Sequence, residues 1–293
     1  MIFINIMGGL GNQLSQYAMA RKLSILLETD FKLDLLTNKF FKKDLVHTYQ
    51  LDQLNTIQNL ATIKEINQFK KPCWQVLKVM NQFKRLLKLD IDKNIIYNSK
   101  CYIEPDATFN PEVFNLPDNT YLWGYFADFR YYDDIREILL QDFSLKEPLS
   151  SQGSQVLEKI KNSNSVSIHF RRGDFLTNLN IRDKVLAVNS DEYYEKAIEY
   201  ISKNVENPEF FIFLDEIDYL KENFKLPYPI TYMDFNPPQR GFEDLYLMSQ
   251  CKHNILAGIS SFSSWAAYLN NNPDKTIITP KNCPTYSNPT LKI

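Results

Sequence analysis

A cluster of charged side chains follows a short apolar run in the middle of the chain. Residues 165–170 predict a buried strand, and His169, Arg171, Arg172 and Asp174 stand at its end. Two adjacent guanidinium groups favour an anionic ligand, because each can pair with phosphate oxygens in bidentate geometry and stays charged at any working pH. Asp174 could orient an arginine or act as a base. The alternative is an Arg–Asp ion pair that only ties down a loop.

A second polar cluster follows a later strand. Glu243 and Asp244 come after a strand expected at 229–234, in the first turn of a helix expected at 241–251. Carboxylates in that turn complement the helix dipole. The functional alternative is that one carboxylate accepts the adjacent N1–H and N2–H donors of a guanine base, which adenine lacks.

A helix start rich in serine forms the third cluster. Ser260, Ser261 and Phe262 follow a strand expected at 253–258 and open a helix expected at 261–271. A serine there is an ordinary N-cap, but a helix N-terminus with two hydroxyl groups also seats a phosphate. Because parallel strands meet at their carboxyl ends, the three clusters together describe a nucleoside diphosphate site.

The sequence gives no reason to expect a metal ion. The three histidines, His47, His169 and His253, are far apart, and Asp215-Glu216 is the nearest approach to an acidic pair after a strand. We therefore predict that the diphosphate is bound without a metal and that no cofactor is needed.

A glycine-rich loop lies near the start of the chain. Gly9, Gly11, Asn12 and Gln13 stand between a strand expected at 2–7 and a helix expected at 14–28, where backbone N–H groups can meet an anion or a sugar. The alternative is a tight strand-to-helix turn. A nicotinamide dinucleotide site is a weak match, because Leu14 occupies the third glycine position of that fingerprint.

The order of the expected elements predicts the fold class. The remaining strands are expected at 31–36, 121–126, 210–215 and 276–280, and the remaining helices at 128–140, 191–204 and 218–224. Alternation of this kind indicates an α/β protein with parallel, doubly wound sheets. A linker expected at 144–153 divides it into domains 1–148 and 149–293.

Composition excludes several classes of protein. The 293 residues carry a formal net charge of −2, which argues against a nucleic-acid binder. The four cysteines form no CxxC pair and suggest no disulfide framework, which fits the cytosol. No apolar run approaches the roughly 20 residues of a membrane-spanning helix.

Two local features have open interpretations. Residues 70–93 hold seven lysines or arginines and two aspartates, a net charge of +5, and predict a basic amphipathic helix. It is either a surface helix or a contact with an anionic membrane or a lipid-linked acceptor. Trp123, Tyr125 and Phe126 are candidates for the core, although an aromatic ring that escapes the core could stack on a sugar.

These motifs resemble glycosyltransferase family 11, the α-1,2-fucosyltransferases that use GDP-fucose. The resemblance rests on residues 8–13 (GGLGNQ), 169–174 (HFRRGD), 213–217 (FLDEI) and 236–267, and it runs over nearly the whole chain. The HFRRGD stretch is shared with α-1,6-fucosyltransferases. The chain departs from the family at Ile259 and Ser264, where members commonly have Asn and Trp.

The resemblance implies a GT-B-like fold, with two Rossmann-like domains and the active site in the cleft between them. The N-terminal domain would take the acceptor and the C-terminal domain GDP-fucose. Arg171, helped by Arg172, would bind the pyrophosphate, and His169 would lie by the nucleotide. Asp244, beside Glu243, would bind the guanine edge. Ser260, Ser261 and Phe262 would contact phosphate or base. Asn12 would lie near the fucose and the β-phosphate.

The resemblance further implies inverting transfer to O2 of a terminal β-galactose. The expected setting is a bacterial surface polysaccharide such as O-antigen, made in the cytoplasm or at the inner membrane, on an acceptor that can be lipid-linked. The alternatives are α-1,6 transfer, another GDP-sugar donor, an NAD-dependent oxidoreductase, and a non-catalytic glycan or membrane binder.

Overall fold

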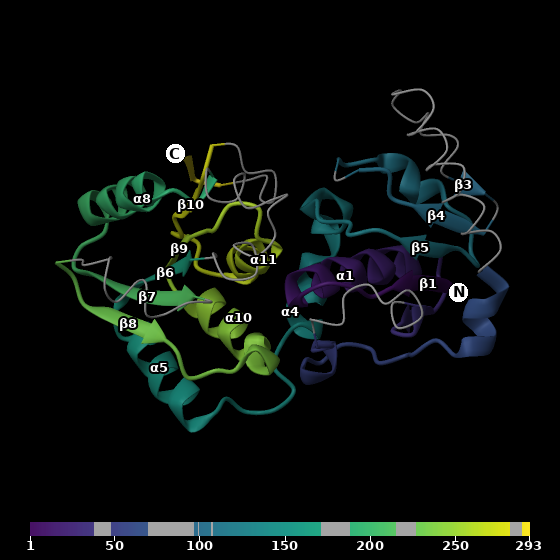
Figure 1. The fold of residues 1–293 in the computed structure, drawn as a ribbon, viewed down its shortest axis with the longest axis horizontal. Helices are drawn as coiled ribbons and strands as arrows, with labels where there is room; N and C mark the ends of the chain where they lie inside the picture. Colours follow the sequence, from purple (N-terminus) through teal and green to yellow (C-terminus); the bar gives the residue numbers. More distant parts are fainter. Residues whose placement is uncertain are drawn as a thin grey trace. The chain divides into compact units, whose positions relative to one another are not determined.

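The structure is a computed structural model that describes residues 1–37, 48–69, 97–98, 100–106, 108–170, 188–214, 227–281 and 289–293. The chain divides into two compact units, Met1–Phe143 and Ser144–Ile293 (Figure 1). We expected the boundary between residues 148 and 149, a few residues after the observed one between Phe143 and Ser144. The basic segment 70–93 lies outside the described residues.

Unit 1 is built on a five-stranded sheet in the order β2-β1-β5-β4-β3. Its strands are β1 (Ile2–Asn5), β2 (Phe31–Asp34), β3 (Tyr97–Asn98), β4 (Cys101–Ile103) and β5 (Tyr121–Trp123). All neighbours are parallel except β3 and β4, which pair antiparallel at one edge. Helix α1 (Leu10–Leu26) connects β1 to β2. The carboxyl ends of β1 and β5 therefore lie side by side.

The prediction of a single helix at 128–140 is wrong. The chain instead forms two 3₁₀ turns, η4 (Phe129–Tyr131) and η5 (Asp133–Ile135), followed by α4 (Arg136–Asp142). The Asp128 side chain accepts the Arg130 N–H at 3.0 Å and starts the first turn. The adjacent Tyr131 and Tyr132 are both almost fully buried. Tyr132, which connects the two 3₁₀ turns, has a φ of −144°, far from the helical value, so a single α-helix cannot run through it.

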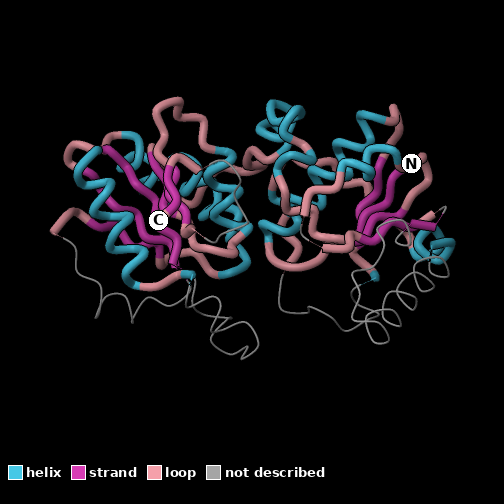
Figure 2. Tube along the Cα trace, turned by 90° about the horizontal axis from the view of Figure 1, so that it is seen from above, coloured by secondary structure: helices cyan, strands magenta, loops and turns pink. Residues whose placement is uncertain are grey.

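Unit 2 is built on a six-stranded parallel sheet in the order β11-β10-β9-β6-β7-β8. Its strands are β6 (Asn164–Phe170), β7 (Pro208–Leu214), β8 (Ile230–Met233), β9 (His253–Ile255), β10 (Ile277–Thr279) and β11 (Leu291–Lys292). Figure 2 shows these strands running between helices. The order is that of Rossmann folds, so the predicted doubly wound α/β architecture is confirmed.

The central strand β6 has one apolar and one polar face. Val166, Ile168 and Phe170 pack in the core with helix α8 (Asp191–Asn204), which Figure 1 shows on one side of the sheet with α10 on the other. The side chains between them, Ser165, Ser167 and His169, point to the opposite face because strand side chains alternate. That face packs on α10 (Gly241–Gln250) and α11 (Ser261–Leu269).

A buried asparagine ties these elements together. Asn254 donates to Ser167 Oγ at 2.7 Å and to the Met248 carbonyl at 3.0 Å, and its own oxygen accepts from Asn270 at 2.7 Å. The network fixes β9, α10 and the end of α11 against β6. The polar face of β6 is therefore hydrogen-bonded to its neighbours at Ser167, two residues before His169.

Part of the expected linker at 144–153 is helical. Helix α5 (Ser151–Lys161) begins inside it, capped by the Ser150 hydroxyl, which accepts the Gly153 N–H at 2.9 Å. Gly153 is buried where α5 meets α10, and a Cβ there would lie 2.0 Å from Glu243 Oε1. The glycine that suggested a linker instead allows two helices to approach closely.

The described cysteines differ in state. Cys251 is free and buried, whereas Cys101 is disulfide-bonded, a bond that the spacing of the cysteines did not indicate. In the part of the chain that the structure describes, no helix has both the length and the apolar character to cross a membrane.

Candidate functional site

The switch point of the unit 2 sheet lies beside β6. After β6 the chain adds β7 on one side of β6 and then β8 beyond β7. It returns to the other side of β6 with β9. Ligands of open α/β sheets bind outside the carboxyl ends of the strands at such a point. His169, the penultimate residue of β6, therefore stands where a ligand is expected. Its backbone carbonyl accepts from the Tyr194 hydroxyl at 2.9 Å, which fixes the strand end.

The connection from β9 to α11 meets His169 at this point. Ser260 Oγ lies 3.4 Å from His169 Nδ1, and the rings of Phe262 and His169 are 5.5 Å apart between centroids. Ser260 is fully buried and also caps α11 by accepting the Ser263 N–H at 3.4 Å. The structure thus brings together three residues of two separate predicted clusters.

The shape of this connection is imposed by its neighbours. Asn189 Oδ1 accepts the Gly258 N–H at 2.6 Å, and Asn189 Nδ2 donates to the Gly258 carbonyl at 3.2 Å. The next residue, Ile259, has a φ of +61°, in the left-handed region that β-branched residues rarely adopt. Asn189 positions the loop, and its sequence neighbourhood carries no motif that could have identified it.

The two predicted carboxylates differ in surroundings. Glu243 is fully buried, and its oxygens accept from Ser150 N at 3.2 Å, from Ser150 Oγ, and from the Arg240 guanidinium, with Nε at 3.0 Å. Asp244 is only partly buried and accepts from Asn236 Nδ2 at 2.7 Å. Glu243 therefore ties α10 to α5, and Asp244 is the better placed of the two to meet a ligand.

The glycine loop of unit 1 is shorter than predicted. Helix α1 begins at Leu10, so Gly11, Asn12 and Gln13 form its first turn rather than a loop. Gly8 has a φ of +76°, and a Cβ on it would lie 2.6 Å from Asn12 Nδ2. Among the described residues, no side chain caps this helix at Gly9. Its N-terminal N–H groups thus face the carboxyl edge of the sheet, where an anion would be stabilised.

Two residues of this turn have different roles. The Gln13 side chain donates to the carbonyls of Gly8 at 2.9 Å and Thr48 at 3.0 Å, and accepts from Gln50 N at 3.1 Å. Gln13 therefore braces the turn from within. Asn12 is partly exposed on the first turn. Leu14 is fully buried in the core, so the third glycine position of a dinucleotide fingerprint is a packing position here.

Five charged residues that the sequence analysis singled out lie outside the described residues: Arg171, Arg172, Asp174, Asp215 and Glu216. Arg171 follows directly on the last residue of β6, Phe170. Within the described ranges, no three His, Cys, Asp or Glu side chains are grouped as metal ligands would be.

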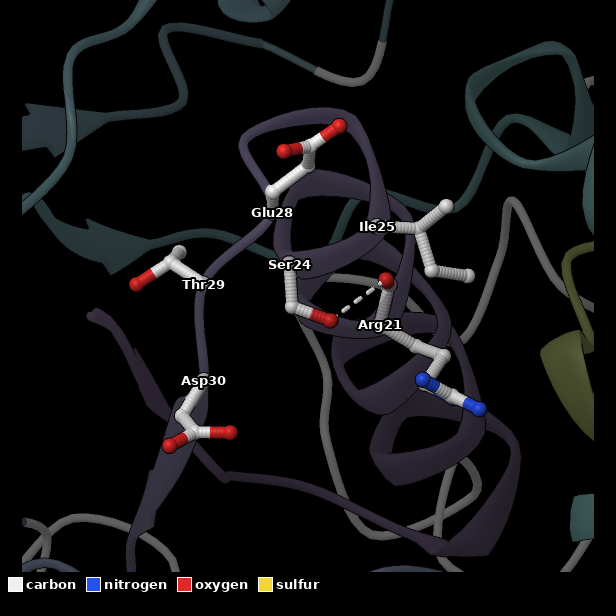
Figure 3. Close-up of a pocket in the computed structure, with 6 residues that line it drawn as sticks. All are labelled: Arg21, Ser24, Ile25, Glu28, Thr29 and Asp30. Atoms are coloured by element: carbon white, nitrogen blue, oxygen red, sulfur yellow. Dashed lines mark hydrogen bonds between the residues drawn. The ribbon is translucent and has the colours of Figure 1, made fainter.

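A shallow cavity of about 420 Å³ lies elsewhere, at the other end of α1 (Figure 3). Arg21, Ser24, Glu28 and Asp30 contribute to its lining. The guanidinium of Arg21 is paired with Asp142 at 3.0 Å, and the Ser24 hydroxyl donates to the Arg21 carbonyl at 2.8 Å. Its polar groups are those of an ordinary helix C-terminus, and none of the predicted site residues lines it.

Comparison with known proteins agrees with the motifs. The model of glycosyl transferase family 11 matches residues 1–289. The O-antigen biosynthesis glycosyltransferase WbnK of Escherichia coli is 29% identical, over 94% of this chain and 92% of that protein. An α-1,2-colitosyltransferase of Escherichia coli is 27% identical, over 92% of this chain and 88% of that protein.

A solved structure shares the fold. The crystal structure of fucosyltransferase NodZ from Bradyrhizobium superposes with a TM-score of 0.50, over 90% of this chain and 91% of that one, at 13% identity. At this identity the likeness concerns the fold alone.

Proposed function

Because the chain belongs to glycosyl transferase family 11, we propose that it transfers L-fucose from GDP-β-L-fucose to O2 of a terminal β-galactose, with inversion at the anomeric carbon. The observation that carries the proposal is the meeting of His169, Ser260 and Phe262 at the switch point of unit 2. These residues belong to two motifs of the family: His169 lies in β6, and Ser260 and Phe262 lie at the start of α11.

The donor nucleotide is assigned to unit 2. The capped N-terminus of α11 and the partly exposed Ser261 suit a phosphate, and the Phe262 ring offers a face for the base. Asp244, in the first turn of α10, is the carboxylate proposed for the guanine edge. In unit 1, Asn12 on the first turn of α1 is proposed to contact fucose and the β-phosphate.

The chemical step needs positive charge at the departing GDP. Attack on the anomeric carbon passes through a transition state that resembles an oxocarbenium ion, and negative charge grows on the diphosphate. Arg171, helped by Arg172, is proposed to stabilise that charge without a divalent cation. Arg171→Ala should lower kcat by roughly 10²–10³, about 3–4 kcal/mol. Near-normal turnover of this variant, or loss of wild-type turnover with a chelator, would contradict the assignment.

The acceptor hydroxyl needs a proton acceptor, and two roles remain for Asp174. It either takes this proton or holds an arginine in place. The pH profile of Asp174→Asn distinguishes them. Loss of the acidic limb indicates a base, whereas an unchanged limb with weaker GDP binding indicates a positioning role.

The decisive experiment is a transfer assay followed by linkage analysis. The protein would be incubated with GDP-fucose and a panel of β-galactosides, and the product linkage determined. The similarity to a colitosyltransferase makes GDP-colitose the donor to test in parallel. Thermal stabilisation by GDP, with none by NAD or UDP, would separate this function from an oxidoreductase or a non-catalytic binder.

The biological setting is proposed from the relatives. The similarity to an O-antigen biosynthesis glycosyltransferase favours assembly of a surface polysaccharide. We place the reaction in the cytoplasm or at the inner membrane, on an acceptor that can be lipid-linked. Cell fractionation with and without the lipid-linked acceptor would test this setting.

A further inference from the structure

The turn after β5 in unit 1 is clamped from several sides. Glu104 Oε2 accepts the N–H groups of Tyr125 at 2.6 Å and Phe126 at 2.9 Å, and the Glu104 N–H donates to the Trp123 carbonyl at 2.8 Å. Burial raises the pKa of the Glu104 carboxyl, and the two N–H donors oppose that shift. A partly buried carboxylate is thus committed to holding one short turn.

The backbone of this turn is strained. Phe126 has a φ of +48°, although its side chain is fully buried against Tyr102 and Tyr131. Gly124 permits the turn, because a Cβ there would lie 2.4 Å from Glu104 Cβ. Left-handed conformations of bulky residues persist only where the surroundings enforce them, and they are frequent at ligand sites.

The strained turn leaves one aromatic ring at the surface. Of the three aromatic residues at this strand end, Phe126 is in the core and Trp123 is half-buried, whereas Tyr125 is 46% exposed. Among the residues whose side chains the structure describes, Tyr125 is the one exposed aromatic ring.

The turn lies at the switch point of the unit 1 sheet. β1 has β2 on one side and β5 on the other, so the turns after β1 and β5 are neighbours. Buried Gln16 connects them directly, accepting the Met7 N–H at 2.9 Å and donating to the Gly124 carbonyl at 3.1 Å. Tyr125 is therefore held in register with the Gly8–Gly9 turn and the N-terminus of α1.

We propose that Tyr125 is the acceptor subsite, where its ring stacks on the apolar face of the acceptor's terminal hexose, and that Glu104 is the residue that positions it. A pyranose presents a face of C–H groups, which pack on an aromatic ring while the hydroxyl groups stay free to bond elsewhere. The inference rests on the proposed function and adds the residue that selects the acceptor.

The test is steady-state kinetics of the full chain, with the acceptor and GDP-fucose varied separately. Tyr125→Ala should raise the acceptor KM about 10- to 100-fold, in the range for loss of one aromatic contact, and leave the GDP-fucose KM within about twofold. Tyr125→Phe should stay close to the wild type, because it keeps the ring. Leu26→Ala is the matched control, since Leu26 is also 46% exposed but lies at the opposite end of α1.

Glu104 is tested by a pair of variants. Glu104→Ala should reproduce the rise in acceptor KM. Glu104→Gln should keep the acceptor KM close to that of the wild type, because an amide oxygen can accept the same two N–H groups. An unchanged acceptor KM in Tyr125→Ala, or an equal rise in both KM values, would overturn the inference while leaving the transferase intact. If the wild type neither binds GDP nor transfers fucose, the proposed function fails, and the acceptor subsite fails with it.

Discussion

At the scale of single residues, the backbone at Ile259 conflicts with its side chain. Its φ of +61° is costly for a β-branched residue and is tolerated by asparagine, the residue that members of the family commonly have here. Of the two departures from the family that are visible in the sequence, the one at Ile259 thus falls on a position with left-handed backbone. The adjacent Gly258 is held through both its N–H and its carbonyl by the Asn189 side chain.

Restoring the asparagine should therefore stabilise the protein. We expect Ile259→Asn to raise the free energy of unfolding by about 1 kcal/mol, because the strain is relieved and only a partly exposed side chain is lost. Urea denaturation would measure the change. Ile57→Asn is the control, since Ile57 is similarly exposed but has no positive φ. A neutral or destabilising result at 259 would mean that the isoleucine makes contacts worth more than the strain.

The types of the site residues could be predicted from the sequence, but not the direction of their polar atoms. His169, Ser260 and Phe262 were expected at strand ends, and the structure brings them together. Gln13 and Glu243 were predicted with them as ligand-binding residues. Their polar atoms instead bond to the backbone and to Ser150 and Arg240, since a strand end or first turn also needs internal hydrogen bonds.

At the scale of elements, α5 depends on a glycine that its own helix does not need. Glycine is normally worse than alanine inside a helix by about 1 kcal/mol. At Gly153 the order should be reversed, because a Cβ would displace the pinned Glu243 carboxylate. We expect Gly153→Ala to lower the free energy of unfolding by about 1–3 kcal/mol, the range for breaking buried polar contacts.

A double-mutant cycle isolates the cause. If the clash with the carboxylate is responsible, Gly153→Ala should cost much less in a Glu243→Ala background than in the wild type. The exposed neighbour Ser154 provides the control, since Ser154→Ala adds no volume at the α5–α10 contact. Equal costs in both backgrounds would locate the effect elsewhere.

The elements of unit 2 were predicted better than those of unit 1 for a physical reason. Its strands are apolar runs separated by amphipathic helices, and α8 has the bounds that were expected. In unit 1 the segment after β5 is held by side chains at close range. Asp128 starts a 3₁₀ turn and Glu104 fixes the turn at Tyr125, and neither contact has a periodic signal in the sequence.

At the scale of the whole molecule, both units repeat one arrangement. In each unit, a central strand (β1 or β6) lies between the next strand along the chain and a strand added later, and predicted site residues stand at or directly after its carboxyl end. The alternation of elements predicted parallel sheets. It did not predict the strand order that creates the switch points, because the pairing of β6 with β9 joins residues more than 80 positions apart.

This division of roles predicts where GDP should protect the chain. Hydrogen–deuterium exchange of the full chain should slow on addition of GDP at residues 260–264 and 241–246, the starts of α11 and α10. Helix α8 packs on the opposite, apolar face of the sheet, so its exchange should change little and it serves as an internal control. UDP and NAD should leave all these segments unchanged, because neither presents the paired N–H edge of guanine. Protection by NAD around residues 8–12, without an effect of GDP on α11, would instead assign the nucleotide to unit 1 and reverse the roles of the two units.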